Sequence, residues 1–327
     1  MARFDALKLP QRNDSDFSLF DSESDDDGPV SPSYAASPSP SPPPRPSVTP
    51  RSSLLAKPVQ AEPRTSALHE SDANGARKGL KLGVSKLRGA DANAASFVLR
   101  TGPNYAKNGN KVPSLSSLYE LVACESIACK TSKIADAPRL FGLPRPAAPV
   151  LDAARALKVP PLFVCNIQLP SRASLFGSGP PDPGTSLVFF FRLRPDTPAN
   201  IPALKLLQHF VGNQLKGRFK VIGYVDNLKD LGVPSVVANF NGRPFIVEKT
   251  GVVHRRAEYV CVDVDVHQFP ILARKSLVGM RGTLPRAVLR CGFVLQGESD
   301  DELPERLLGG AVVSGVNLDE VVWVPEA

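Results

Sequence analysis

Two carboxylates and an imidazole recur at every second position near the end of an apolar run. Asp263, Asp265 and His267 alternate with valines, and a period of two places them on one face of a predicted strand. Neighbours on one strand face lie about 7 Å apart, so the three groups could hold a metal ion or share acid–base work. The alternative is a solvated or salt-bridged face of a strand whose other face is core. We favour this alternative, because no further ligand cluster is identifiable.

Basic side chains gather at two other places and form a candidate lipid or anion site. The set is Lys216, Arg218, Lys220, Arg255 and Arg256. Arg218 and Lys220 share one face of a predicted strand, so they could pair with Asp263 and Asp265 if the two strands adjoin, or contact phosphate headgroups if they do not. The formal net charge of +7 also suits an anionic lipid or membrane surface as a partner.

Sequence signatures of common enzyme classes are missing. There is no Gly-x-Ser-x-Gly elbow, no Walker loop, no dinucleotide-binding glycine fingerprint after a strand and no His-Glu-x-x-His pair. The five cysteines are odd in number and far apart, as is typical of reduced thiols in a cytosolic protein. The basic runs lack the interleaved aromatic residues that stack on bases. We therefore expect a cytoplasmic protein that is not an enzyme, holds no metal or cofactor and binds no nucleic acid.

Residues 1–94 are predicted to form a disordered, Ser/Pro-rich tail. Between residues 28 and 63, 19 of 36 positions are proline or serine, and such a run buries too little apolar surface to offset the entropy of ordering. Residues 14–27 set three apolar side chains in an acidic run, which suits either a docking motif for a protein partner or a solvated tail. Residues 77–88 mix leucines with basic residues and could form a basic amphipathic turn on a bilayer or a flexible linker. No apolar run approaches the roughly 20 residues of a membrane-spanning helix.

From residue 95 onward, the apolar pattern predicts one domain, residues 95–327. Its predicted strands are 162–169, 187–193, 218–225, 245–249, 259–266 and 287–295. Its predicted helices are 200–215, which begins near Pro202, 269–278, and a helix over 303–309 entered through a Ser299 cap with Glu302 three positions on. Strands outnumber helices without strict alternation. The expected class is therefore α+β, with a largely antiparallel curved sheet and a few covering helices.

Several residue runs occur in an order that resembles one family. They are Val159–Pro170, Ser174–Gly177, Leu187–Leu193, Arg218–Lys220, Tyr259–Val266 and Leu303–Gly309, after an earlier match in Phe97–Val122. On these runs, about residues 95–325 resemble the C-terminal domain of the plant Enhanced Disease Resistance 2 protein, a domain of unknown function. The chain departs from the family pattern at Arg290, where members commonly carry an acidic residue.

The resemblance implies a regulatory role. In plant members this domain follows pleckstrin-homology and lipid-transfer-type domains, and the full proteins are linked to phosphoinositide binding and to negative regulation of defence and cell death. We expect this chain to lack those partner domains, so their lipid binding is not carried over.

Two functions from different classes remain open. The first is a non-catalytic regulatory or binding module with peripheral lipid or membrane association. The second is an interaction adaptor that docks a protein through residues 14–27. A closed apolar cavity lined by core strands would favour ligand holding, and a filled core would favour the adaptor.

Overall fold

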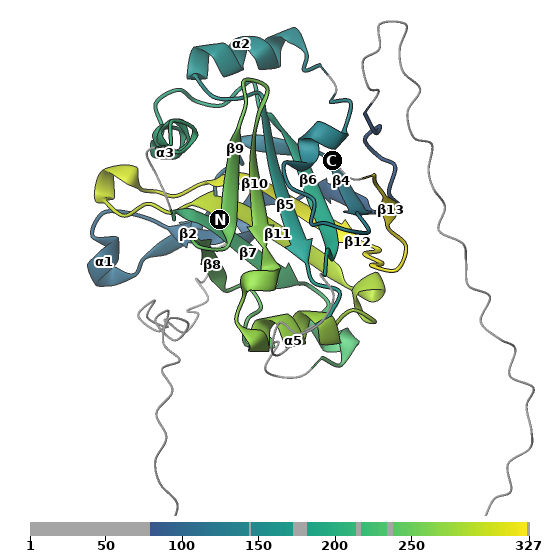
Figure 1. Ribbon diagram of the computed structural model, residues 1–327. Coiled ribbons are helices and arrows are strands. Elements are labelled where there is room, and N and C mark those ends of the chain that lie inside the picture. The colour runs from purple at the N-terminus through teal and green to yellow at the C-terminus, as the bar shows by residue number, and fades with distance from the viewer. Residues whose placement is uncertain (1–78, 144, 173–181, 214–216, 234–237, 326–327) are drawn as a thin grey trace, which may run out of the picture. The chain divides into compact units, whose positions relative to one another are not determined.

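The computed structural model describes residues 79–325, except for residues 144, 173–181, 214–216 and 234–237 (Figure 1). All described residues belong to one unit of the chain. A second unit, Asn13–Pro63, lies outside the described residues. The predicted docking segment 14–27 and the Ser/Pro-rich run are therefore also outside them.

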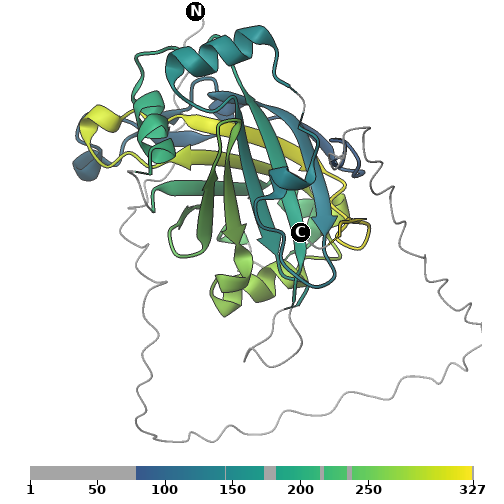
Figure 2. The same cartoon turned by 45° about the horizontal axis from the view of Figure 1, so that its top comes forward.

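Two β-sheets make up most of the described fold, and their strands cross one another (Figure 2). The five-stranded sheet has the order β1-β12-β11-β7-β8, and the six-stranded sheet has the order β13-β4-β6-β5-β10-β9. Strands β2 and β3 pair separately. Among the described strands, neighbours are antiparallel except for β10 with β5 and β13 with β4. The predicted α+β class with a largely antiparallel sheet is confirmed, with the strands divided between two main sheets, neither of them closed.

The strands are β1 (Arg88–Asp91), β2 (Val98–Arg100), β3 (Lys111–Pro113), β4 (Tyr119–Ala128), β5 (Leu162–Leu169), β6 (Thr185–Leu193), β7 (Phe219–Val225), β8 (Pro244–Val247), β9 (Gly251–Arg255), β10 (Tyr259–Asp265), β11 (Val288–Leu295), β12 (Leu307–Ser314) and β13 (Val322–Trp323). The α-helices are α1 (Tyr105–Asn108), α2 (Ala148–Leu157), α3 (Pro202–Val211) and α5 (Ile271–Gly279). All six strands predicted from alternation are present, each within about two residues of its predicted ends.

Aromatic rings fill the space between the two sheets. Phe163 and Phe191 of the six-stranded sheet stack at 5.5 Å between centroids, and Phe163 meets Phe293 of the five-stranded sheet edge-on at 5.9 Å. Phe219 stacks on Phe293 at 6.1 Å. All four side chains are buried, and burial of each contributes about 1.5–3 kcal/mol. The interior where the sheets face each other is thus packed with side chains.

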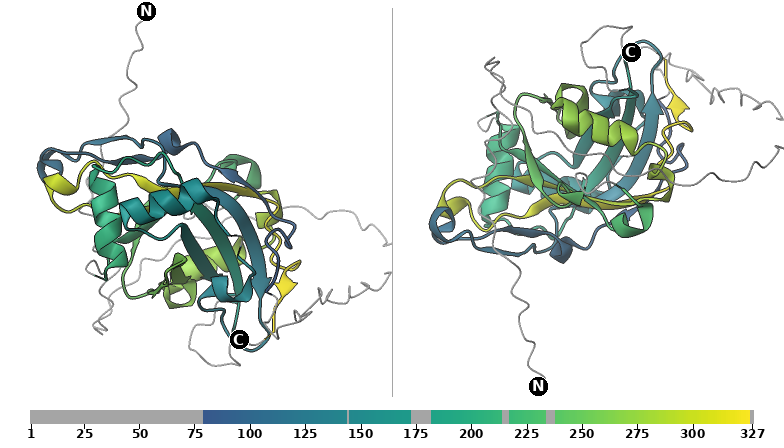
Figure 3. Two further views of the ribbon diagram at one scale, coloured as in Figure 1. Left: turned by 90° about the horizontal axis from the view of Figure 1, so that it is seen from above. Right: turned by 90° about the horizontal axis from the view of Figure 1, so that it is seen from below.

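Helices lie at the two ends of the sheets (Figures 1 and 3). Helix α3 begins at Pro202 as predicted and packs its apolar face into the core, with Phe210 stacked on Phe219. Its fixed proline φ suits the first helical turn. Helix α5, also predicted, lies at the opposite end from α2, and none of its residues is buried.

A second apolar cluster covers the outer face of the six-stranded sheet. Residues 129–143 lie over that face, where Phe141 meets Phe190 edge-on at 5.1 Å. All seven residues of β10 are buried. Of the two alternatives for its polar face, solvated or salt-bridged, the second holds, because residues 129–143 cover this face and Asp265 pairs with Lys133 at 2.5 Å.

The fold begins before residue 95, so the predicted tail boundary is too late. Strand β1 pairs with β12, with Arg88 opposite Ser314, and the Leu80 amide donates to the Leu140 carbonyl at 2.8 Å. Residues 79–87 are extended with turns instead of forming an amphipathic helix. The buried carboxylate of Glu125 accepts hydrogen bonds from the Gly83 and Ser85 amides and holds this N-terminal arm on β4.

The predicted helix over 303–309 is wrong, although its cap is present. Ser299 and Glu302 form the capping box, but the helix is a single 3-10 turn, Asp300–Glu302. Pro304 lacks a backbone N–H and clashes with a preceding helical turn. Strand β12 follows instead, and at Gly309 a Cβ atom would lie only 2.7 Å from the Phe191 ring.

Candidate functional site

The carboxylate of Asp263 is the centre of a buried polar network on the outer face of the six-stranded sheet. Its Oδ2 lies 2.7 Å from His254 Nε2 and accepts the Asp136 amide at 3.0 Å. Its Oδ1 accepts the Asn166 side-chain amide at 2.9 Å. Asn166 lies directly opposite Asp263 because β5 and β10 pair in parallel. Strand pairing therefore supplies the partners of this carboxylate.

Asp265 has a separate set of partners. Its oxygens lie 2.5 Å from Lys133 Nζ, 2.9 Å from His267 Nδ1 and 2.8 Å from Gln268 Nε2. Burial alone would raise the pKa of Asp265, but the hydrogen bonds from His267, Lys133 and Gln268 outweigh it and hold the pKa below its usual range. Within the described ranges, no cluster of three or more His, Cys, Asp or Glu side chains is arranged to hold a metal ion.

The network fixes residues 133–136 over the sheet. Asn166 and Gln168 both donate to the Ile134 carbonyl, at 2.8 and 2.6 Å. The Asp136 carboxylate accepts the Tyr259 hydroxyl at 2.9 Å and lies 3.2 Å from Arg256 Nη2. Each acid of this network is thus hydrogen-bonded to a neighbouring segment, and these bonds hold residues 133–136 in place over the sheet.

Two of the predicted basic site residues pair with the loop at 297–306. Arg218 lies 2.8 Å from Glu298 and 2.7 Å from Glu302, and Lys220 lies 2.7 Å from Glu305. Pairing with Asp263 or Asp265 does not occur, because β7 and β10 belong to different sheets. Burial lowers the pKa of Lys220 to about 8, although the carboxylate of Glu305 acts in the opposite direction.

The other predicted basic residues lie on the six-stranded sheet. Arg255 donates to the Phe210 carbonyl through Nε and Nη2, at 3.2 and 3.1 Å, and so ties β9 to the end of α3. Arg256 is half exposed beside Asp136. Lys216 lies outside the described residues. The four described residues are thus divided between two sheets, and anion binding by the five stays a prediction.

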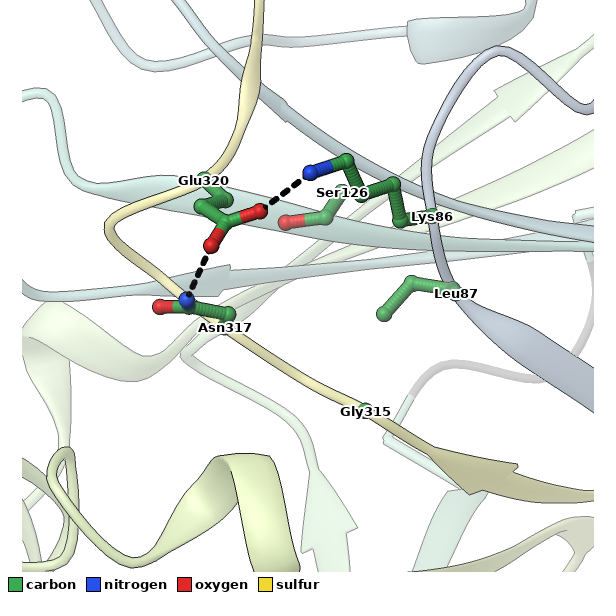
Figure 4. A pocket seen from close by; sticks show the side chains of 6 residues that line it. All are labelled: Lys86, Leu87, Ser126, Gly315, Asn317 and Glu320. Carbon is green, nitrogen blue, oxygen red and sulfur yellow. Dashed lines mark hydrogen bonds and ion pairs between the residues drawn. The ribbon is translucent and has the colours of Figure 1, made fainter. Parts of the chain in front are cut away.

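A small polar pocket of about 170 Å³ lies where the N-terminal arm meets the segment after β12 (Figure 4). Lys86 and Glu320 form an ion pair of 2.6 Å, and Asn317 donates to the same carboxylate at 3.1 Å. On the pocket wall, the buried Ser126 hydroxyl has no hydrogen-bond partner among the described residues. The ion pair is exposed to solvent, so we interpret it as a weak contact that positions the arm.

Sequence reasoning missed the surface that α5 forms. The side chain of Leu272 is 52 % exposed, Lys275 is exposed, and the remaining apolar residues of the helix are only half-buried. Between Asp265 and Glu298 the chain has no acidic residue but carries Arg274, Lys275, Arg281, Arg286 and Arg290. This acid-free run is visible in the sequence and could have directed attention to α5.

Most of the described sequence matches one known protein family. The family model described as Protein ENHANCED DISEASE RESISTANCE 2, C-terminal, matches residues 90–317. The chain belongs to this family. A search of curated proteins finds no match to the chain. In the Enhanced Disease Resistance 2 C-terminal domain of this chain, the matched range runs from β1 through β12 and includes α5, the Asp263 network and the Lys220–Glu305 pair.

The Enhanced Disease Resistance 2 C-terminal domain of this chain uses Arg290 as a structural residue. The guanidinium lies 4.0 Å from the Tyr224 ring centroid and 5.2 Å from that of Phe97. It also pairs with Asp226 at 2.7 Å and donates to the Ser96 carbonyl at 3.0 Å. These contacts join β11 to β7 and to the residues before β2.

Proposed function

We propose that this domain is a non-catalytic binding module that acts in the cytoplasm and associates peripherally with an anionic membrane surface through α5. The observation that carries the proposal is the composition and exposure of this helix. It presents apolar and basic side chains together, within a stretch of chain that has no acidic residue. Aromatic rings fill the space between the sheets. This filled core was expected to favour the adaptor; it argues against a ligand held in the core and is equally compatible with binding at a surface.

The binding of α5 to a membrane would combine two modest contributions to the binding free energy. A leucine transferred from water into the headgroup region contributes up to about 1.5–3 kcal/mol, and each basic side chain close to an anionic surface about 1 kcal/mol. Leu272 and Lys275 are the exposed residues of each kind on α5. A sum of this size gives reversible binding that weakens as salt screens the charges.

The burial and the hydrogen bonds of the acidic residues support the non-catalytic part of the proposal. The carboxylates of Asp263, Asp265 and Glu305 are buried, and each accepts hydrogen bonds from neighbouring parts of the fold. Removing such bonds to receive a substrate would leave buried donors unpaired, at a cost of about 1–3 kcal/mol each. We therefore infer that these groups serve stability.

Vesicle flotation of the full chain tests the proposal. We expect the protein to float with vesicles of phosphatidylcholine and phosphatidylserine, and to stay behind with phosphatidylcholine alone. Leu272→Asp and Lys275→Glu should each reduce flotation. The matched controls are Leu115→Asp, at a side chain that is 67 % exposed, and Lys158→Glu at the end of α2. Absence of flotation, or equal loss in the controls, would overturn the proposal.

The adaptor alternative depends on residues 14–27, which lie outside the described residues, and it stays a prediction. Neutralising the acids of this segment in the full chain distinguishes the two. A changed set of co-purifying proteins together with unchanged flotation would support an adaptor role for the segment, separate from the α5 surface.

A further inference from the structure

A second open pocket, of about 310 Å³, lies at one end of the six-stranded sheet. Its walls come from the residues after β4, including Lys130, from Thr185 at the start of β6, and from the C-terminal segment with Trp323. Arg281, two residues beyond the end of α5, completes the lining. The volume is at the lower limit of small-molecule sites.

The apolar side of this pocket contains the single tryptophan of the chain. Trp323 is half-buried on β13, which pairs with the end of β4. Leu318 and Val321 also line the pocket. A half-buried indole beside aliphatic side chains provides a surface on which the apolar body of a small molecule can lie.

The charged side of the pocket favours an anion. Arg281 is held in place by Asp319, at 2.7 Å from Nη2, and by the Leu318 carbonyl at 2.9 Å. Lys130 is exposed and forms no ion pair with any part of the chain that the structure describes. The lining therefore carries two cations against one carboxylate, and that carboxylate is already paired with Arg281.

From this arrangement we propose that the pocket binds an organic phosphate. Its phosphate group would lie against Lys130 and against the edge of the Arg281 guanidinium that Asp319 and the Leu318 carbonyl do not occupy. Its apolar body would lie on Trp323. The Lys130 ammonium supplies the attraction for a phosphate, because the charge of Arg281 is already paired with Asp319, and a neutral ligand would not gain from it. The site does not depend on membrane association through α5.

Tryptophan fluorescence of the full chain tests this site directly, because the only indole lines the pocket. We expect n-butyl phosphate, added without vesicles, to change the emission of Trp323 in a saturable manner. n-Butanol and inorganic phosphate each lack one half of the ligand and should bind more weakly. Lys130→Gln should weaken n-butyl phosphate binding by about tenfold, which corresponds to the loss of about 1.4 kcal/mol. Lys158→Gln, remote from the pocket lining, is the matched control.

Three outcomes would overturn the proposal. They are no saturable change with n-butyl phosphate, an equal response to n-butanol, and unchanged binding by Lys130→Gln. A second experiment with phosphatidic acid vesicles distinguishes a lipid phosphate from a soluble one. A site for a lipid changes the emission of Trp323 when these vesicles are added, whereas a site for a soluble phosphate responds only to n-butyl phosphate in solution. Absence of flotation of the unmodified chain, together with saturable n-butyl phosphate binding, would overturn the α5 surface and leave this site standing.

Discussion

The ammonium nitrogen of Lys220 lies 2.7 Å from each carboxylate oxygen of Glu305, and both side chains are buried. The same carboxylate accepts the Gly297 amide at 3.0 Å, and the Glu305 amide donates to the Arg100 carbonyl at 2.9 Å. A single acidic residue thus joins β7, the end of β2 and both ends of the loop between β11 and β12. The pair positions this loop. Because both charges are removed from water, either residue without the other would be an uncompensated buried charge and would destabilise the fold.

Removal of one member of this pair should destabilise the domain strongly. Lys220→Met leaves the Glu305 carboxylate buried without its cation, and we expect a loss of about 3–5 kcal/mol in the free energy of unfolding. The double variant Lys220→Met/Glu305→Gln should recover a large part of this loss, because the amide is neutral and still accepts the Gly297 amide. Urea denaturation of the full chain measures both. A double variant as unstable as the sum of the single ones would contradict this account.

The lowered pKa of Asp265 predicts a pH-dependent contribution to stability. The unfolded chain binds a proton at this carboxyl at higher pH than the folded chain does, so the stability it provides is present above the ordinary carboxyl pKa of about 4 and is lost as pH falls below it. The difference in unfolding free energy between the wild-type chain and Asp265→Asn should be constant near neutral pH and shrink in acid. Denaturation at a series of pH values measures it.

Lys133 provides the matched control for the Asp265 prediction. Lys133→Met removes one of the groups that lower the pKa of Asp265, so the decline in acid should be smaller and should be complete at higher pH. A difference between wild type and Asp265→Asn that grows in acid would contradict the assignment.

Arg290 should tolerate neither loss of charge nor reversal of charge. Arg290→Glu removes the contacts with the Tyr224 and Phe97 rings and places a second carboxylate beside Asp226. We expect it to cost about 2 kcal/mol more than Arg290→Lys, which keeps the charge but loses the planar fork. Thermal and urea unfolding of the two variants give the comparison. Equal stability of the variants would show that the charge of Arg290 is unimportant.

Local patterns in the sequence predict much of this fold. The alternation of valines and polar residues in 259–265 identifies β10, and Pro202 marks the first turn of α3, because strand faces and helix starts depend on residues a few positions apart. The capping box of Ser299 and Glu302 was also predicted from its local spacing. The order of several such runs was also sufficient to indicate the family that the match over residues 90–317 confirms.

Long-range pairing explains the predictions that were wrong. Strand β1 is recognisable only through β12, which lies more than two hundred residues away, so the local composition placed the tail boundary too late. The outer face of β10 carries Asp263 and Asp265 and was expected to be either solvated or salt-bridged. It is buried because residues 133–136 lie over it, held by Asn166 and Asp263.

The amino-acid sequence by itself determined six of the strands, the positions of α3 and α5, and the family to which the domain belongs, since these follow from short-range periodicity and from the order of residue runs. Only the tertiary structure decided which charges meet. Arg218 and Lys220 pair with the loop at 297–306, and not with Asp263 and Asp265, because the sheet to which a strand belongs depends on the packing of the whole chain. The tertiary structure also decided the exposure of α5 and the presence of the pocket beside Trp323, because a surface exists only where no other element covers it.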